Sequence, residues 1–244
     1  MRYTIITVVL NGLEQLKITM DGVLKQKFTD YEYVIIDGGS QDGTVEFLED
    51  MTMKDSRIRY ISEKDTGIYN AMNKGLRLAQ GDYVMFLGAG DVFCDEHTLE
   101  TVAQYLKYDL IYGRIIYSSG PFEGQIGGDK MNRKTFLLDG HVAHQSVYVK
   151  TSVMKKYGFQ EKYKIEADQD AMMRMYKDKC SVKYIKQPLC YYDGLGVSID
   201  SMMNEQNILD RVSMLKEHFP VLYAIRTVGH WIKTGETFNL TKHQ

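Results

Sequence analysis

The feature that most constrains the fold is a strict alternation of strand-like and helix-like segments over the first half of the chain. Strands are expected at residues 3–9, 31–37, 57–62, 81–87 and 109–113, with helices between them at 13–23, 44–53, 68–80 and 97–106. Strands that alternate with helices in this way predict βαβ units and a parallel sheet. In such a sheet ligands bind beyond the carboxyl ends of the strands. The sequence therefore predicts an α/β fold with its functional site at that edge.

The second half of the chain is less regular. Residues 113–128 alternate and contain turn residues, which indicates antiparallel strands. Further strands are expected at 144–150, 182–185 and 189–193, and helices at 151–157 and 168–176. We expect this half to continue the same sheet as a mixed edge, followed by a helical pattern from Ser201.

Composition excludes several classes of protein. The 244 residues carry a formal net charge of −2, so no strong field draws the chain to nucleic acid. The three cysteines form no C-x-x-C pair, which argues against zinc and dithiol chemistry. The apolar run at residues 3–10 is far shorter than the roughly 20 residues of a membrane span, so a cytoplasmic location is expected.

Small polar turns follow the first four expected strands. They read Asn11-Gly12, then DGGSQDGT at 37–44, EKDTG at 63–67 and GAGD at 88–91. Any one of them is ordinary turn composition. Four at one edge of one sheet indicate a shared site.

Each turn leaves two interpretations open. Asp37 follows a buried strand directly and is favoured as a ligand contact, whereas Asp42 is favoured as a helix cap. Asp65 precedes a helix at capping distance, although a helix that begins at Gly67 would also favour an anion such as a diphosphate. Asp91 either closes a tight turn or holds a cation.

Two phosphate-binding motifs are absent from these turns. The turn after the first strand does not contain G-x-G-x-x-G, which disfavours a dinucleotide site. The chain also has no G-x-x-x-x-G-K-[ST] loop.

Three motifs in order, TIITVVLNG, IIDGGSQDGT and SEKDTGIYNAMNKGLRLAQGDYVMFLGAGD, resemble the family 2 glycosyltransferases. The resemblance is close over residues 3–91 and looser to about residue 198. It implies a GT-A (Rossmann-like) fold with a mixed, mostly parallel central sheet flanked by helices. The GT-A domain would span 1–200, with a nucleotide-sugar half at 1–113 and an acceptor half at 114–200, and a helical extension would span 201–244.

The resemblance also implies a nucleotide-sugar donor, usually a UDP-sugar, a divalent metal ion, and transfer with inversion. GAGD stands where the family has D-x-D, so Asp91 becomes the ligand of Mn²⁺ or Mg²⁺ and Gly90 replaces an acid that often meets the ribose. Such cations often bind one or two carboxylates together with substrate phosphates. The expected donor-binding residues are Thr7, Val9, Asn11, Asp37, Gly38, Asp65, Gly67, Asn70, Asn73, Gly90 and Asp91.

The base is expected in YKIEADQDAMMRM, which also has the composition of an ordinary acidic helix start. By resemblance Asp168 is the general base, Arg174 is a charge partner, and Glu166 is the rival base. One base is enough for an inverting transfer. His144 and Gln145, with Glu166, are expected on the acceptor side, although a lone histidine is more often a packing residue.

The acceptor is expected to be a saccharide or a lipid-linked molecule in polysaccharide biosynthesis. The segment 230–236, HWIKTGE, suits either a packed tryptophan or peripheral association with the inner face of a membrane. Gly196 and Ser198 suit either a plain loop or closure over phosphates.

Two other functions remain open from the sequence. A sugar-phosphate nucleotidyltransferase would need a glycine-rich basic loop after the first strand, where this chain has only Asn11-Gly12. A non-catalytic nucleotide- or saccharide-binding relative would explain the reduced GAGD element.

Overall fold

The computed structural model describes residues 2–131, 142–194, 205–221, 223 and 224. Within these residues one nine-stranded sheet has the order β3-β2-β1-β4-β8-β6-β9-β5, with β7 beside β6. The strands are β1 Tyr3–Val9, β2 Tyr31–Asp37, β3 Ile58–Ser62, β4 Tyr83–Phe86, β5 Val92–Phe93, β6 Leu110–Tyr117, β7 Ile126–Gly127, β8 Val147–Lys150 and β9 Val182–Tyr192. The helices are α1 Leu13–Leu24, α2 Thr44–Lys54, α3 Ile68–Leu78, α4 Thr98–Ala103, α6 Thr151–Tyr157, α7 Ala167–Lys177 and α9 Glu205–His218, with 3-10 turns η1 Gly120–Phe122 and η2 His144–Ser146.

Strands β1 to β4 are parallel, as the alternation predicts. Tyr3 pairs with Tyr31 of β2 on one side and with Tyr83 of β4 on the other. The chain therefore moves outward from β1 to β3 and then returns to the opposite side of β1. This reversal is a topological switch point between β1 and β4, where open α/β sheets bind ligands.

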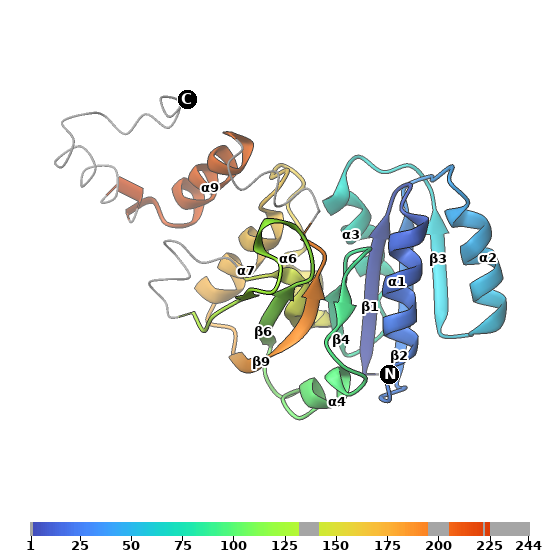
Figure 1. Cartoon of the computed structure of the whole chain (residues 1–244). Coiled ribbons are helices and arrows are strands. Elements are labelled where there is room, and N and C mark those ends of the chain that lie inside the picture. Colours follow the sequence, from blue (N-terminus) through green and yellow to red (C-terminus); the bar gives the residue numbers. More distant parts are fainter. Residues whose placement is uncertain (1, 132–141, 195–204, 222, 225–244) are drawn as a thin grey trace.

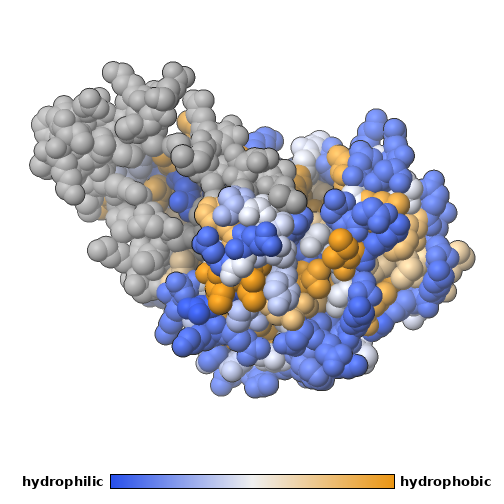
Figure 2. All heavy atoms as spheres, in the orientation of Figure 1, coloured by the Kyte–Doolittle hydropathy of each residue, from blue (hydrophilic) through white to orange (hydrophobic). Residues whose placement is uncertain are grey.

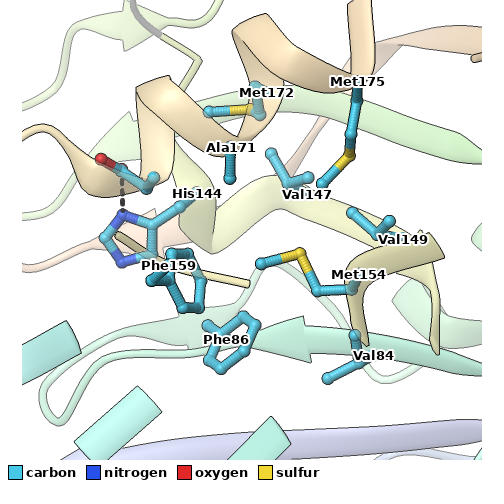
Figure 3. A pocket seen from close by; sticks show the side chains of 11 residues that line it. Val84, Phe86, His144, Val147, Val149, Met154, Phe159, Ala171, Met172 and Met175 are labelled. Carbon is cyan, nitrogen blue, oxygen red and sulfur yellow. Dashed lines mark hydrogen bonds and ion pairs between the residues drawn. The ribbon is translucent and has the colours of Figure 1, made fainter. Parts of the chain in front are cut away.

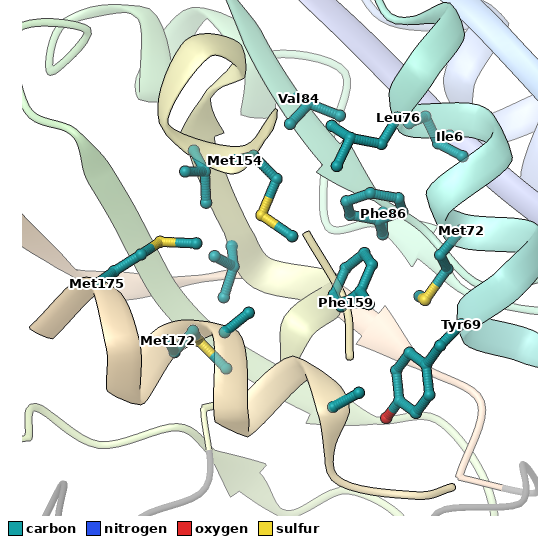
Figure 4. Close-up of a cluster of buried hydrophobic side chains, with 14 of the residues drawn as sticks. Ile6, Tyr69, Met72, Leu76, Val84, Phe86, Met154, Phe159, Met172 and Met175 are labelled. Carbon is teal, nitrogen blue, oxygen red and sulfur yellow. The ribbon is translucent and has the colours of Figure 1, made fainter. Parts of the chain in front are cut away.

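Successive residues of the central strands face opposite layers of helices (Figure 1). Ile5 and Ile35 pack in one core with Leu16 of α1 and Leu48 of α2. Their neighbours Ile6 and Ile36 pack in the other core with residues of α3, α6 and α7. Figure 4 shows this second core, which includes Met154, Phe159, Met172 and Met175 together with Phe86 of β4. The methionines of α7 are thus core residues, because flexible thioethers fill irregular space between helix and sheet.

The second half of the chain adds antiparallel pairs to the sheet, in line with the expected mixed edge. β8 runs antiparallel to β4 and to β6, while β9 runs parallel to β6. The two short strands expected at 182–185 and 189–193 are one strand, β9, whose pairing with β6 is irregular around Arg114 and Pro188. Proline lacks the amide proton of a regular ladder, so it is tolerated at such an irregularity.

The expectation that a strand begins at His144 is wrong. Residues 144–146 form the 3-10 turn η2, and the strand begins at Val147. The turn is closed by a hydrogen bond from the Ser146 amide to the Ala143 carbonyl, 3.0 Å, and by the Ser146 hydroxyl on the Gly113 carbonyl, 2.9 Å. The two-residue strand β5 is an element that the sequence analysis did not anticipate.

Helix α9 lies beside α7, at the opposite end of the molecule from α2 (Figure 1). It confirms the helical pattern expected after Ser201. Among the described helices, none combines the length and apolar character needed to cross a membrane. The segment 230–236, Gly196 and Ser198 lie outside the described residues.

Candidate active site

A cleft of about 410 Å³ opens at the switch point between β1 and β4. Its walls include Val9 and Asn11 from the end of β1, Asp91 from the turn after β4, and His144 and Gln145 from η2. Five residues expected at a donor or acceptor site are therefore brought together from three distant parts of the chain. The further lining residues include Ile6, Val8, Leu10, Gly12, Gln15, Ile68, Met72, Phe86, Leu87, Gly88, Ala89, Tyr192 and Asp193.

The rim of this cleft is partly apolar. Leu10 is 59% exposed and Ile68 is 46% exposed, although both are large hydrophobic side chains. In Figure 2 hydrophobic residues gather near the middle of the described surface, with hydrophilic residues around its lower edge. Pockets for organic ligands usually combine such apolar walls with a few polar groups.

Asp91 both closes the GAGD turn and faces the cleft. Its carboxylate accepts hydrogen bonds from the amides of Gly88, 3.1 Å, and Asp193, 2.9 Å. Gly90 has the positive φ of +101° that the turn needs, and its amide is held by the Thr19 hydroxyl of α1. Because the residue is only 3% exposed, burial raises the pKa of Asp91 to about 7.

Asp193 places a second carboxylate beside Asp91. A Cβ atom added to Gly90 would lie 2.8 Å from the Asp193 carboxylate, which therefore fills the space that a larger residue at position 90 would need. The Ser119 hydroxyl donates to the other carboxylate oxygen at 3.0 Å. The sequence analysis missed Asp193, although it follows an apolar strand just as Asp91 does.

These two carboxylates fit a divalent cation that also binds donor phosphates. Among the described residues, no group of three or more His, Cys, Asp or Glu side chains is arranged to hold a metal ion by itself. Mg²⁺ and similar hard cations commonly use one or two carboxylates and take their remaining oxygen ligands from phosphates and water. The donor set of Asp91 and Asp193 matches that mode of binding.

Asp168 lies at the start of α7, behind His144 as seen from the cleft. One of its oxygens is 3.0 Å from Nδ1 of His144, and the other accepts a hydrogen bond of 3.0 Å from the Tyr69 hydroxyl of α3. Burial lowers the pKa of His144, but the hydrogen bond and charge of Asp168, together with the charge of Asp91, outweigh it and raise the pKa overall. Asp168 and His144 are thus a paired acid and base, of which His144 lines the cleft.

Glu166 is held at the α9 side of α7. It is 1% exposed and lies 3.5 Å from the Arg211 guanidinium. Burial, with a contribution from the Asp168 charge, raises the pKa of Glu166 to about 7. Neither Glu166 nor Asp168 is among the described residues that line the cleft, but Asp168 contacts the lining residue His144. The choice of Asp168 over Glu166 as the base stays a prediction.

Arg174 is a charge partner, as expected, but of Asp170. Its Nε is 2.8 Å from the fully buried Asp170 carboxylate, and the guanidinium also donates to the Tyr157 and Gly158 carbonyls. His218 of α9 contacts the other Asp170 oxygen at 2.6 Å. This buried cluster fixes the helix that carries Asp168.

Asp37 and Asp65 do not line the cleft as the described residues form it, and the Asp65 carboxylate lies close to Gly38, the residue after Asp37. A Cβ atom on Gly38 would lie 2.9 Å from the Asp65 carboxylate. The Asp37 side chain is fully buried and accepts hydrogen bonds from the Gly39 and Ser40 amides, each 3.0 Å, and from the Ser62 hydroxyl, 2.6 Å. Contact between Asp37 and a ligand remains a prediction, and in this structure its carboxylate braces the loop after β2.

Other predicted donor contacts bind protein groups. The Thr7 hydroxyl is fully buried and donates to the Leu87 carbonyl at 2.8 Å. Asn73 is hydrogen-bonded to the backbone of Phe159, and Asn70 to the Glu161 carboxylate, so both amides join α3 to the segment before α7. Gly67 begins α3 with a φ of +137°, which suits glycine. None of these four lines the cleft as the described residues form it.

Comparisons with known proteins agree with this geometry. The sequence model of "Glycosyl transferase family 2" matches residues 4–182. The chain belongs to this family. A "PGL/p-HBAD biosynthesis glycosyltransferase" of Mycobacterium bovis (strain BCG / Pasteur 1173P2) is 28% identical over 239 residues, covering 95% of this chain and 91% of that protein. An uncharacterized glycosyltransferase of Mycobacterium tuberculosis (strain ATCC 25618 / H37Rv) is 29% identical over 247 residues, covering 96% and 91%.

Solved structures share the fold of this family 2 glycosyltransferase. The S. aureus protein TarS, residues 1–349 in complex with UDP-GlcNAc, superposes with a TM-score of 0.67 at 17% identity, covering 90% of this chain and 68% of that one. The mannosyltransferase PcManGT of Pyrobaculum calidifontis, in complex with GDP-Man and Mn²⁺, gives a TM-score of 0.64 at 16% identity, covering 99% and 67%. The expected GT-A fold is confirmed, and the protein is a glycosyltransferase rather than a nucleotidyltransferase.

Proposed function

We propose that this enzyme transfers a sugar from a nucleotide-sugar, first among them a UDP-sugar, to a saccharide or lipid-linked acceptor with inversion at the anomeric carbon. The observation that carries the proposal is the cleft between β1 and β4, which is lined by Asp91 and Asp193 and by His144. TarS binds UDP-GlcNAc and PcManGT binds GDP-Man on the same fold, which supports a nucleotide-sugar as the donor.

The carboxylate wall suits the donor diphosphate. Asp91 and Asp193 would hold Mn²⁺ or Mg²⁺ together with the donor phosphates. When bound, the cation would neutralise the charge that grows on the departing nucleoside diphosphate. The Gly88–Asp91 turn is fixed through Thr19 and through Asp193, so the protein presents these oxygens in a preset geometry.

The part of the cleft that His144 lines suits the acceptor. Asp168 and His144, whose facing atoms are 3.0 Å apart, form the basic pair that takes up the proton of the attacking hydroxyl. An inverting transfer needs this one base, because the acceptor oxygen attacks the anomeric carbon from the face opposite the leaving group. The apolar side chains of Leu10 and Ile68 at the rim suit the less polar face of a sugar or a lipid-linked acceptor.

A panel of UDP- and GDP-sugars, offered with and without Mn²⁺, tests this function. We expect hydrolysis or transfer of at least one donor, dependence on the cation, and inverted anomeric configuration of the product by NMR. Asp168→Asn should abolish transfer while leaving UDP affinity nearly intact. A protein that neither binds nor turns over any nucleotide-sugar would refute the proposal, and full turnover by Asp168→Asn would remove Asp168 from the mechanism.

A further inference from the structure

His144 stands between Asp168 and the cleft. The imidazole belongs to the described lining of the 410 Å³ cleft, whereas Asp168 does not. The exposed fraction of the side chain is 21% for His144 and 12% for Asp168. A sugar hydroxyl that enters the cleft therefore reaches the imidazole before it reaches the carboxylate.

The orientation of the Asp168 carboxylate is fixed from several sides. Oδ1 accepts hydrogen bonds from the Tyr69 hydroxyl, 3.0 Å, and from the Gln169 amide, 2.9 Å. Oδ2 is the atom that faces Nδ1 of His144, at 3.0 Å. An ionised carboxylate is only an acceptor, so this contact places the imidazole proton on Nδ1 and leaves Nε2 with its lone pair.

The imidazole ring is itself fixed by its surroundings. It sits on the closed η2 turn and also lines a small cavity of about 30 Å³ behind the cleft. The other walls of that cavity are almost entirely apolar and include Phe86, Phe159 and Ala171 (Figure 3). The dashed contact in Figure 3 joins one ring nitrogen of His144 to Asp168. Apolar surroundings strengthen the interaction between the ring and Asp168.

We propose that His144 is the group that takes the proton from the acceptor, and that Asp168 acts through it. This inference rests on the proposed function and specifies its base. As the acceptor oxygen forms its bond to the anomeric carbon, its O–H bond breaks and the proton passes to Nε2 of His144. The bond from the anomeric carbon to phosphate oxygen breaks at the same time, and its electron pair leaves with the nucleoside diphosphate. Asp168 stays ionised, holds the tautomer and stabilises the imidazolium, which later returns its proton to water.

Variants of both residues test the relay. We expect His144→Ala to lower kcat by about 10²-fold or more, the usual contribution of a positioned base. UDP affinity, measured by calorimetry in the presence of Mn²⁺, should stay unchanged. Added imidazole should restore part of the lost kcat in His144→Ala, because the deleted ring leaves space beside Asp168. His144→Gln keeps a polar side chain of similar length and serves if His144→Ala does not fold.

His97→Ala provides a matched control. His97 also pairs with a carboxylate, with Nδ1 at 2.6 Å from Glu100, but this exposed pair lies at the start of α4, outside the cleft. Its removal should leave kcat unchanged, with or without imidazole.

The double variant His144→Ala/Asp168→Asn completes the test. If Asp168 acts through His144, kcat should fall no further in the double variant than in the worse single one. The inference is overturned if His144→Ala keeps a kcat close to that of the wild type. It is also overturned if imidazole does not restore the kcat of His144→Ala and the double variant loses kcat by the product of the two single losses. Asp168 would then act on the acceptor directly. Both of these results leave sugar transfer by the wild type, and hence the proposed function, in place.

Discussion

The two halves of the molecule hold their carboxylates in different ways. In the donor half, Asp37 is bound by Gly39, Ser40 and Ser62, the first two of which belong to its own loop. In the acceptor half, Asp168 contacts a histidine 24 residues away, and Asp170 contacts one 48 residues away. Asp37 is therefore held mostly by its own loop, whereas Asp168 and Asp170 are each paired with a histidine of another element.

The cleft lies where these two kinds of construction meet. Asp91 belongs to a local turn of the donor half, yet its carboxylate is joined to the Asp193 amide at a separation of 102 residues. The site therefore depends on the docking of the end of β9 against the turn after β4. We expect decreasing effects from variants at Asp91 in this junction, at Asp170 in the buried cluster of α7, and at the buried carboxylate Glu166.

The largest effect is expected from Asp91→Asn. The change removes the negative charge from the donor wall, while the amide side chain can still accept one of the two backbone hydrogen bonds. We expect Mn²⁺-dependent transfer to fall at least about a thousandfold, or about 4 kcal/mol in the barrier. The matched variant Asp37→Asn should instead lower the melting temperature with a smaller loss of rate, because Asp37 braces a loop. If the two variants lost transfer rate equally, Asp91 would have no larger part in the reaction than Asp37, and the contrast would be wrong.

The contrast also explains what the sequence could predict. The strands and helices of residues 3–87 agree with the expectations to within a few residues, because apolar periodicity and turn residues are local features. Of the four strand-end turns that were expected to share a site, those with Asn11 and Asp91 line the cleft, whereas Asp37 and Asp65 do not. Resemblance to a family supplied Asp168, which local pattern alone cannot distinguish from an acidic helix start.

The sequence could not predict which polar side chains would be hydrogen-bonded to other groups of the protein. From the sequence, Thr7, Asn70 and Asn73 were expected to contact the donor. In the structure each is hydrogen-bonded to a residue from a distant segment of the chain. The same long-range pairing hides Asp193, whose partner is known only once β5 and β9 are paired. A short strand such as β5 carries too few residues for any periodicity to show.

A second variant, Asp170→Asn, tests the cluster of the acceptor half. Asp170 is fully buried and pairs with Arg174 and His218, whose side chains are 16% and 8% exposed. Removing one member of a buried ion pair leaves uncompensated charge, so we expect a loss of about 3 kcal/mol in unfolding free energy by chemical denaturation.

Glu32→Gln is the comparison from the donor half. Glu32 is also buried, but its partner Arg59, at 2.6 Å, is 41% exposed and can be hydrated once the charge is gone. We therefore expect a smaller loss than for Asp170→Asn. A larger loss for Glu32→Gln would show that buried charge is no more critical in the acceptor half than in the donor half.

The smallest effect, and the one that depends on pH, is expected from Glu166→Gln. Burial raises the pKa of Glu166 from 4.5 to about 7, so the folded protein favours the protonated form. The stability that this shift contributes is complete below pH 4.5 and is lost as the pH rises through about 7. Glutamine does not ionise, so relative to the wild type the variant should gain on the order of 1 kcal/mol between pH 5 and pH 8.

Two effects of this variant can be distinguished. Loss of the contact with Arg211 lowers the free energy of unfolding of the variant equally at every pH. Relief of the buried charge instead changes how steeply the free energy of unfolding depends on pH. Unfolding curves at several pH values separate the two, and parallel curves for variant and wild type would mean that Glu166 is ionised, and stabilised by Arg211, throughout this range.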